Sequence, residues 1–143
     1  MRAEVRERPF DPLAELVAYQ QGLAAGAYGA LTSFVGTMRD FNEGDAVLGM
    51  RLEHYPGMTE RFLERLLAEA AERWPLLDAL ILHRVGALAP GDPIVLVAVW
   101  SAHRGATFEA CRFLIERLKS EAPFWKKERL QDGERWVEHN TPG

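Results

Sequence analysis

PIVLVAVWSA, residues 93–102, is an almost uninterrupted apolar run, and HRG, residues 103–105, follows it directly. An apolar run without polar alternation is typical of a strand that is buried on both faces. Apolar residues then recur at helical spacing from about Gly105 to Glu121, and Pro123 follows. We therefore predict a central buried strand that leads through a short turn into a helix.

Turn signals and apolar periodicity predict the remaining elements on both sides of this unit. Helices are expected at 11–21 and 58–74, and strands at 29–38, 46–55, 77–85, 125–130 and 134–138. We expect strands 29–38 and 46–55 to form a long hairpin, and Gln131-Asp132-Gly133 to close a C-terminal hairpin. This order favours an α+β fold similar to an α/β hammerhead, a mixed or antiparallel sheet with two main helices, over a doubly wound parallel sheet.

Length and composition indicate one domain over residues 1–143, with 48% hydrophobic and 27% charged residues. The formal charge of -4 argues against a general nucleic-acid binder, so any anion site has to be local. The single cysteine excludes an internal disulfide framework. No run approaches the roughly 18 apolar residues of a membrane span. We expect a cytoplasmic protein without a membrane partner.

A basic pair, His103 and Arg104, stands where the buried strand meets the helix. The backbone N–H groups and the dipole at a helix N-terminus favour an anion, and a guanidinium adds a fork that fits phosphate or carboxylate. The alternative is local: His103 caps the chain and Arg104 is a solvated residue of the first turn.

Lys119 lies 11 residues after Phe108, which is about three helical turns, so it falls beside the expected apolar stripe of its own helix. A partly desolvated ammonium has a lowered pKa and can act as acid, base or nucleophile. Long lysine side chains also extend from the edge of buried faces to water without any catalytic role. Spacing alone favours this second interpretation.

Phe124-Trp125-Lys126-Lys127-Glu128-Arg129 places two aromatic residues before a basic cluster, which suits a phosphate or a flat heterocycle. In a strand, Lys126 and Glu128 share one face and Lys127 points to the other, so only one of the two lysines can face a given site. The alternative is an exposed edge strand that its charges protect from aggregation. Both interpretations remain open from the segment alone.

Three further residue types are weaker candidates. Arg39 follows a predicted strand and could reach a ligand, although surface loops hold most arginines. Cys111 falls on the apolar helix face and is interpreted as a buried small hydrophobe rather than a sulfur carrier. His54 and His83 have no partner at metal-ligand spacing, so no metal site and no cofactor are predicted.

Five segments stand out in order along the chain: Phe34-x-Gly36-x-x-Arg39, Leu52-Glu53-His54-Tyr55-Pro56-Gly57-Met58, His83-Arg84-Val85-Gly86, Ser101-Ala102-His103-Arg104, and Lys119-x-x-x-Pro123-x-Trp125-Lys126-Lys127-Glu128. Together they resemble the large-subunit family of molybdopterin synthase, over about residues 29–137.

The resemblance implies an enzyme of molybdenum-cofactor biosynthesis, a sulfurtransferase. It implies a homodimer in which each chain binds a small ubiquitin-like subunit, a heterotetramer overall. The sulfur then belongs to the thiocarboxylate at the Gly-Gly C-terminus of that partner. The implied substrate is cyclic pyranopterin monophosphate, which becomes the dithiolene of molybdopterin. On this basis Pro142-Gly143 is not expected to be a donor tail.

The resemblance also assigns the site. It implies catalytic roles for Lys119 and Lys126, and it implies that both also bind substrate together with Thr37, Met38, Arg39, His103, Arg104, Lys127 and Glu128. His103 and Arg104 are hypothesised to act across the dimer interface. The chain departs from the family at Thr37-Met38, and its segment after Trp136 is short, which puts closure of the pocket in question.

Two other functions compete with this one. The chain could be a dimeric module that holds a ubiquitin-like tail without transforming anything, although Lys119 and Lys126 speak against it. It could also be an unrelated enzyme that acts on a phosphorylated ligand. The absence of a Gly-rich phosphate-binding loop from the sequence counts against this alternative.

Overall fold

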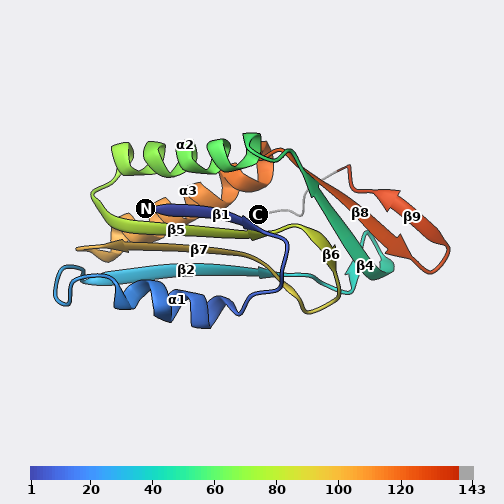
Figure 1. Ribbon diagram of the computed structural model, residues 1–143, viewed down its shortest axis with the longest axis horizontal. Coiled ribbons are helices and arrows are strands. Elements are labelled where there is room, and N and C mark those ends of the chain that lie inside the picture. The colour runs from blue at the N-terminus through green and yellow to red at the C-terminus, as the bar shows by residue number, and fades with distance from the viewer. Residues whose placement is uncertain (139–143) are drawn as a thin grey trace.

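The computed structural model describes residues 1–138, which form two β-sheets and three helices (Figure 1). The first sheet is built on β7, the strand over the apolar run. Its order is β1-β5-β7-β2, with β1 parallel to β5 and the other pairs antiparallel. The bounds of its strands are β1 Arg2–Arg6, β2 Ala30–Thr37, β5 Leu76–Arg84 and β7 Pro93–Ser101.

The second sheet lies at one end of the first and carries the C-terminal hairpin (Figure 1). Its order is β3-β4-β8-β9, and β6 pairs with β4 off this path. All of its pairs are antiparallel. The bounds of its strands are β3 Phe41–Asn42, β4 Asp45–His54, β6 Gly86–Leu88, β8 Phe124–Leu130 and β9 Gly133–Trp136.

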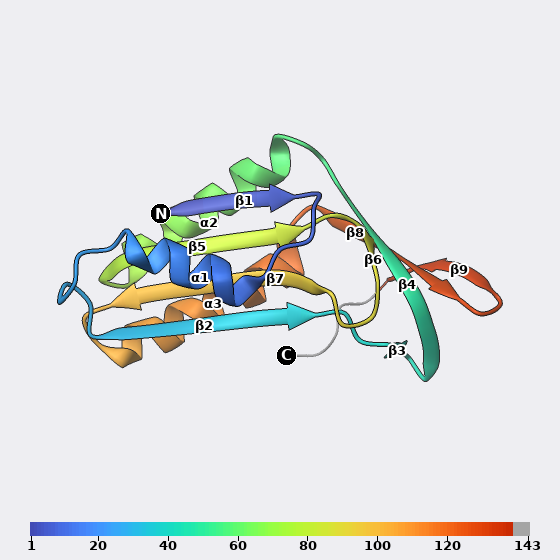
Figure 2. The same ribbon diagram turned by 60° about the horizontal axis from the view of Figure 1, so that its bottom comes forward.

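The helices cover both faces of the first sheet. Helices α2 (Met58–Arg73) and α3 (Arg104–Glu121) pack on one face, and α1 (Pro12–Gln21) crosses the other, as Figure 2 shows. Helix α1 begins where the carboxylate of Asp11 accepts the backbone N–H of Leu13 at 3.0 Å. The predicted helices are thus confirmed.

Strand β7 is buried on both faces, as its apolar run predicts. Val95, Val97 and Val99 pack into the core under α2 and α3. Leu96, Ala98 and Trp100 alternate to the opposite core under α1. A third, smaller core lies beside the junction of the two sheets and contains Met38, Val47, Met50, Leu52 and Leu88.

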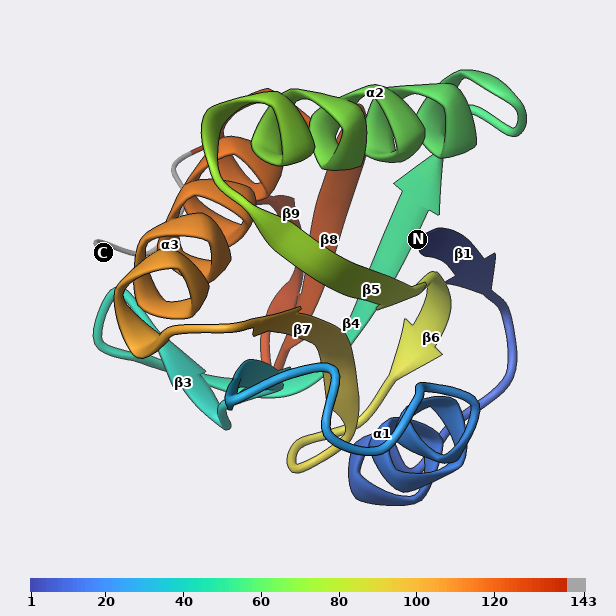
Figure 3. The ribbon, with the colours of Figure 1, turned by 90° about the vertical axis from the view of Figure 1, so that its left-hand side faces the viewer.

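The long hairpin expected from strands 29–38 and 46–55 is wrong. β2 pairs with β7 in the first sheet, whereas β4 pairs with β8, β6 and β3 in the second, and Figure 3 shows how β4 and β8 run across the end of the first sheet. Turn signals predict that the chain reverses but not which strand then pairs with which. The first strand, β1, was not predicted because it offers only two apolar side chains, Ala3 and Val5, among three charged ones, although both pack against the first core.

The C-terminal hairpin of β8 and β9 is confirmed, and the antiparallel β5–β7 pair matches the predicted strands around residues 90–92. The α+β class and the absence of a doubly wound sheet are confirmed as well. The expectation that Pro142-Gly143 is not a donor tail concerns residues outside those that the structure describes. Among the helices of residues 1–138, none is long and apolar enough to cross a membrane.

Candidate functional site

A hollow opens where β2 ends, between the C-terminal half of α3 and the start of β8. It consists of two adjoining depressions that share six lining residues, and the deeper one is a cavity of about 240 Å³. The shared residues are Gly36, Thr37, Ile94, Ile115, Lys119 and Lys126. Three of the sequence-predicted residues, Thr37, Lys119 and Lys126, therefore line both depressions, and Met38 and Arg39 line the outer one.

The end of β2 is fixed to the turn before β7. The register of β2 against β7 shifts between Gly36 and Thr37. The backbone N–H of Met38 then donates to the carbonyl of Asp92 at 2.9 Å, and the Met38 carbonyl accepts from Gly91 N–H at 2.8 Å. These bonds bury the Met38 side chain and leave Arg39 exposed at the outer depression. The segment Thr37-Met38-Arg39 thus forms one wall of the hollow.

Gly36 permits the close packing of this wall. A Cβ atom on Gly36 would lie 3.0 Å from Cγ1 of Val95 and 3.3 Å from Cε1 of Phe34. A larger residue would therefore push on the floor of the hollow, which both depressions share.

Lys119 and Lys126 approach the hollow from different elements. Lys119 comes from the last turn of α3, and Lys126 from β8, where it pairs with Leu52 of β4. Burial lowers the pKa of Lys119, and the positive charge of Arg39 adds to this effect while Glu116 opposes it. Burial also lowers the pKa of Lys126, together with the charge of Lys119 and against that of Glu128. Both amines therefore lose their protons more readily than a surface lysine does.

Lys119 is half-buried beside the apolar face of α3, as predicted. The residue from which this position was counted does not belong to that face. Phe108, used as part of that face, is 61% exposed. The buried stripe of α3 consists of Thr107, Ala110, Cys111, Leu114, Ile115 and Leu118. Lys119 follows Ile115 and Leu118 around the helix, and these two residues line the cavity with it.

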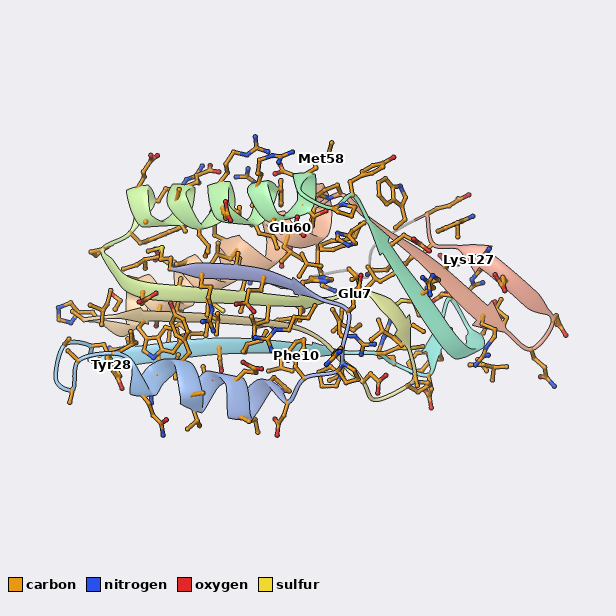
Figure 4. The ribbon with its side chains drawn as sticks, in the orientation of Figure 1. Glu7, Phe10, Tyr28, Met58, Glu60 and Lys127 are labelled. Carbon is orange, nitrogen blue, oxygen red and sulfur yellow. The ribbon has the colours of Figure 1, made fainter. Side chains whose placement is uncertain are left out.

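Lys127 lies away from the hollow, as the alternation along a strand requires. Its ammonium is 2.9 Å from a carboxylate oxygen of Glu134 and 5.2 Å from the ring centroid of Trp136. It lines a separate groove over β4, β8 and β9, and Figure 4 labels it on that part of the molecule.

Glu128 shares the inward face of β8 with Lys126 but does not line the hollow. Its side chain is 6% exposed and accepts from Nε of Arg135 at 3.0 Å and from Nδ2 of Asn42 at 3.1 Å. The buried carboxylate thus ties β3 and β9 to β8. Its influence on the site runs through its charge near Lys126.

His103 and Arg104 are exposed at the opposite end of α3 from Lys119. Fifteen residues separate Arg104 from Lys119, about 22 Å along a helix. His103 is the N-cap residue, but its side chain makes no capping hydrogen bond. Within one chain, the structure does not bring this pair to the hollow.

Two aromatic lining residues are not among the residues predicted to form the site. His83 and Phe124 line the cavity and stack with ring centroids 4.0 Å apart and an interplanar angle of 15°. His83 was set aside because it has no metal-ligating partner. The sequence places it near the end of the predicted strand 77–85, but that this end lies beside the end of β2 depends on strand pairing.

The arrangement suits an anionic ligand with a flat, partly apolar body. Arg39, Lys119 and Lys126 supply positive charge to a chain of formal charge -4. Ile94, Ile115 and Phe124 supply apolar surface. Cys111 is 3% exposed, and burial raises the pKa of its thiol to about 11, so it is unsuited to carry sulfur. Residues 1–138 contain no group of three or more metal-ligating side chains placed to hold a metal ion.

Comparison with known proteins gives concordant matches. The family model described as "MoaE protein" matches residues 5–121. The molybdopterin synthase catalytic subunit of Ralstonia nicotianae is 54% identical over 134 residues, which cover 94% of this chain and 75% of that protein. The crystal structure of molybdopterin synthase from Staphylococcus aureus superposes with a TM-score of 0.85 at 33% identity, covering 95% of this chain and 96% of that one. A complex of subunits 1 and 2 of molybdopterin-converting factor from Helicobacter pylori shares the fold, with a TM-score of 0.81 at 21% identity, and covers 97% and 92% of the two chains.

Proposed function

The chain belongs to the MoaE family, and from this premise we propose that it is the catalytic subunit of a molybdopterin synthase. In this function it is a sulfurtransferase. Two sulfur atoms pass to cyclic pyranopterin monophosphate, each from the C-terminal thiocarboxylate of a small ubiquitin-like subunit that is left as a carboxylate, and the dithiolene of molybdopterin forms. The observation that carries the proposal is the hollow lined by Arg39, Lys119 and Lys126, because both reactants are anions.

Lys119 and Lys126 are the proposed catalytic residues. Their lowered pKa values let each amine exchange a proton at a smaller energetic cost than an exposed lysine. Lys119, on α3, is assigned to the thiocarboxylate as general acid and base, with Lys126 assisting. Arg39 and the backbone of Thr37 and Met38 hold the phosphate and the pterin at the outer depression.

The distance of His103 and Arg104 from the hollow supports the proposal that two copies of the chain form each site. The pair then comes from the second copy of a homodimer, which with two small subunits gives a heterotetramer. Their exposure at the N-terminus of α3 leaves them available for such a contact. Lys127 and Glu128 are proposed to shape the surroundings of the site rather than to touch substrate.

Reconstitution tests the proposal. The purified chain is mixed with a thiocarboxylated small subunit and the cyclic pterin precursor, and molybdopterin is measured as its fluorescent oxidation product. We expect product with the wild-type chain and loss of nearly all product with Lys119→Ala. A partner complex that forms without any product would favour the non-catalytic binding module instead.

A further inference from the structure

His83 is a buried, titratable side chain that the proposed roles leave unused. It is 4% exposed at the end of β5, and its ring stacks on Phe124. It lines the same cavity as Lys119 and Lys126. The ring is therefore held in one orientation at the floor of the proposed site.

The hydrogen bonding of His83 defines its tautomer. Nδ1 lies 2.8 Å from the carbonyl oxygen of Arg84. A carbonyl only accepts, so Nδ1 carries the proton and Nε2 of the neutral ring carries a lone pair. Within residues 1–138, the fully buried side-chain nitrogens and oxygens without a hydrogen-bond partner are His54 Nδ1 and Arg84 Nη1. Nε2 of His83 is not among them, and the hydrogen bonds described for residues 1–138 do not include one to it, so this atom is accessible. Since His83 lines the cavity, we infer that Nε2 is the ring atom that faces it.

The surroundings keep this ring neutral. Burial lowers the pKa of His83 to about 3. The hydrogen bond to the carbonyl of Arg84 opposes this shift, and electrostatic interactions with Lys126 on β8, Lys119 on α3 and His54 on β4 add to it. Arg39 and Glu116 act in turn on Lys119, and Glu128 acts on Lys126. The cavity thus has cations around one neutral acceptor at neutral pH.

We propose that His83 is a ligand-binding residue whose Nε2 accepts a hydrogen bond from an N–H group of the bound reactant. A lone pair repels the oxygens of phosphate or thiocarboxylate, so these groups are directed to Arg39, Lys119 and Lys126. His83 therefore orients the reactant as well as binding it. This inference rests on the proposed function, and it specifies which edge of the reactant enters the cavity first.

Two reactants offer such an N–H group: the pterin ring and the backbone of the partner's C-terminal tail. Binding experiments can separate them. The first probe is the cyclic pterin precursor without partner, and the second is a synthetic peptide of the partner's C-terminal residues ending in Gly-Gly. Affinities are measured by calorimetry with the full chain.

Two variants separate the lone pair from the structural bond. His83→Asn keeps an N–H at the position of Nδ1, which can still donate to Arg84, but it has no acceptor at the position of Nε2. His83→Gln keeps an acceptor oxygen at the position of Nε2 and loses the other bond. Thermal unfolding of both variants checks that they are folded.

We expect His83→Asn to weaken binding of one of the two probes by about five- to tenfold, the effect of one neutral hydrogen bond. His83→Gln should bind that probe within about twofold of the wild-type chain, and the affected probe identifies the source of the N–H group. Wild-type affinity in His83→Asn for both probes, or an equal loss in both variants, would overturn the inference alone. A wild-type chain that binds neither probe would overturn both this inference and the proposed function.

Nitrogen NMR of the free protein gives an independent check. Nε2 of His83 should remain unprotonated from pH 8 to pH 5, a range in which an ordinary histidine gains its second proton. A doubly protonated ring at pH 6 would contradict the inference whatever the binding results.

Discussion

Replacing Glu128 with Gln separates the structural role of this carboxylate from the substrate-binding role that the family resemblance implies. The variant keeps the shape of the side chain and removes its charge. Arg135 then has a neutral acceptor in place of the carboxylate at 3.0 Å but keeps Asp45 at 2.8 Å. The amide of Asn42, which donates to Glu128 at 3.1 Å, faces a weaker acceptor. The damage should therefore fall on the attachment of β3 and β9 to β8.

The expected size follows from burial. Glu128 is 6% exposed, and hydrogen bonds to charged groups contribute about 1.5–3 kcal/mol each. Arg135 is partly exposed and keeps its other ion pair, so we expect a loss in unfolding free energy of about 2 kcal/mol. For a chain of this size the melting temperature should fall by roughly 8 °C.

Calorimetric melting measures this effect, and Glu134→Gln is the matched control. Glu134 pairs with Lys127 on the exposed side of the same hairpin, so its substitution should cost less than about 0.5 kcal/mol. Affinity for the cyclic pterin precursor should remain near wild type in Glu128→Gln at a temperature where the variant is folded. An unchanged melting temperature with a large loss of precursor affinity would refute the structural role.

Three further predictions follow from the site. Lys126→Met should melt at a higher temperature than the wild-type chain at pH 7, because it removes a buried ammonium whose pKa is lowered, and it should lose most sulfur transfer. This stability advantage should shrink as pH rises toward 10. Lys126 keeps its proton to a higher pH in the unfolded chain than in the folded one, so the wild-type chain gains stability over this range. An advantage independent of pH would contradict this. Between pH 6.5 and 3 the unfolding free energy of the wild-type chain should fall by about 1 kcal/mol per pH unit, because only the unfolded imidazole of His83 binds a proton. His83→Gln should remove this part of the fall, and an equal fall in both chains would count against a buried neutral His83. Mixing inactive Lys119→Ala and Arg104→Ala chains, with subunit exchange, should restore roughly a quarter of wild-type product formation. Half of the dimers are then mixed, and each mixed dimer has one intact site out of two. No recovery would mean that both residues belong to the site of one chain or that the chain does not form the dimer.

The sequence predicts best what depends on local pattern. The apolar run of β7 predicts burial on both faces, and the structure confirms it with Val97 in one core and Ala98 in the other. Period-2 alternation likewise predicts that Lys126 and Lys127 point to opposite faces of β8. These results require only the geometry of one strand.

Properties that depend on which strands pair could not be predicted in this way. β2 and β4 are separated in the chain by a short segment typical of a hairpin loop, which contains only β3, yet each finds its partners in a different sheet. The role of Glu128 depends on Asn42 and Arg135, which approach it from β3 and β9. His83 escaped for the same reason, because its neighbours Lys119 and Phe124 are distant in sequence.

The central claim is that the partner, and not this chain, supplies the sulfur. The most direct measurement is a single turnover with a small subunit whose thiocarboxylate carries a heavy sulfur isotope, followed by mass analysis of the dithiolene product. The account predicts heavy isotope in both product sulfurs, with the wild-type chain and equally with Cys111→Ala. Product that contains unlabelled sulfur, or that disappears with Cys111→Ala while the chain stays folded, would contradict it.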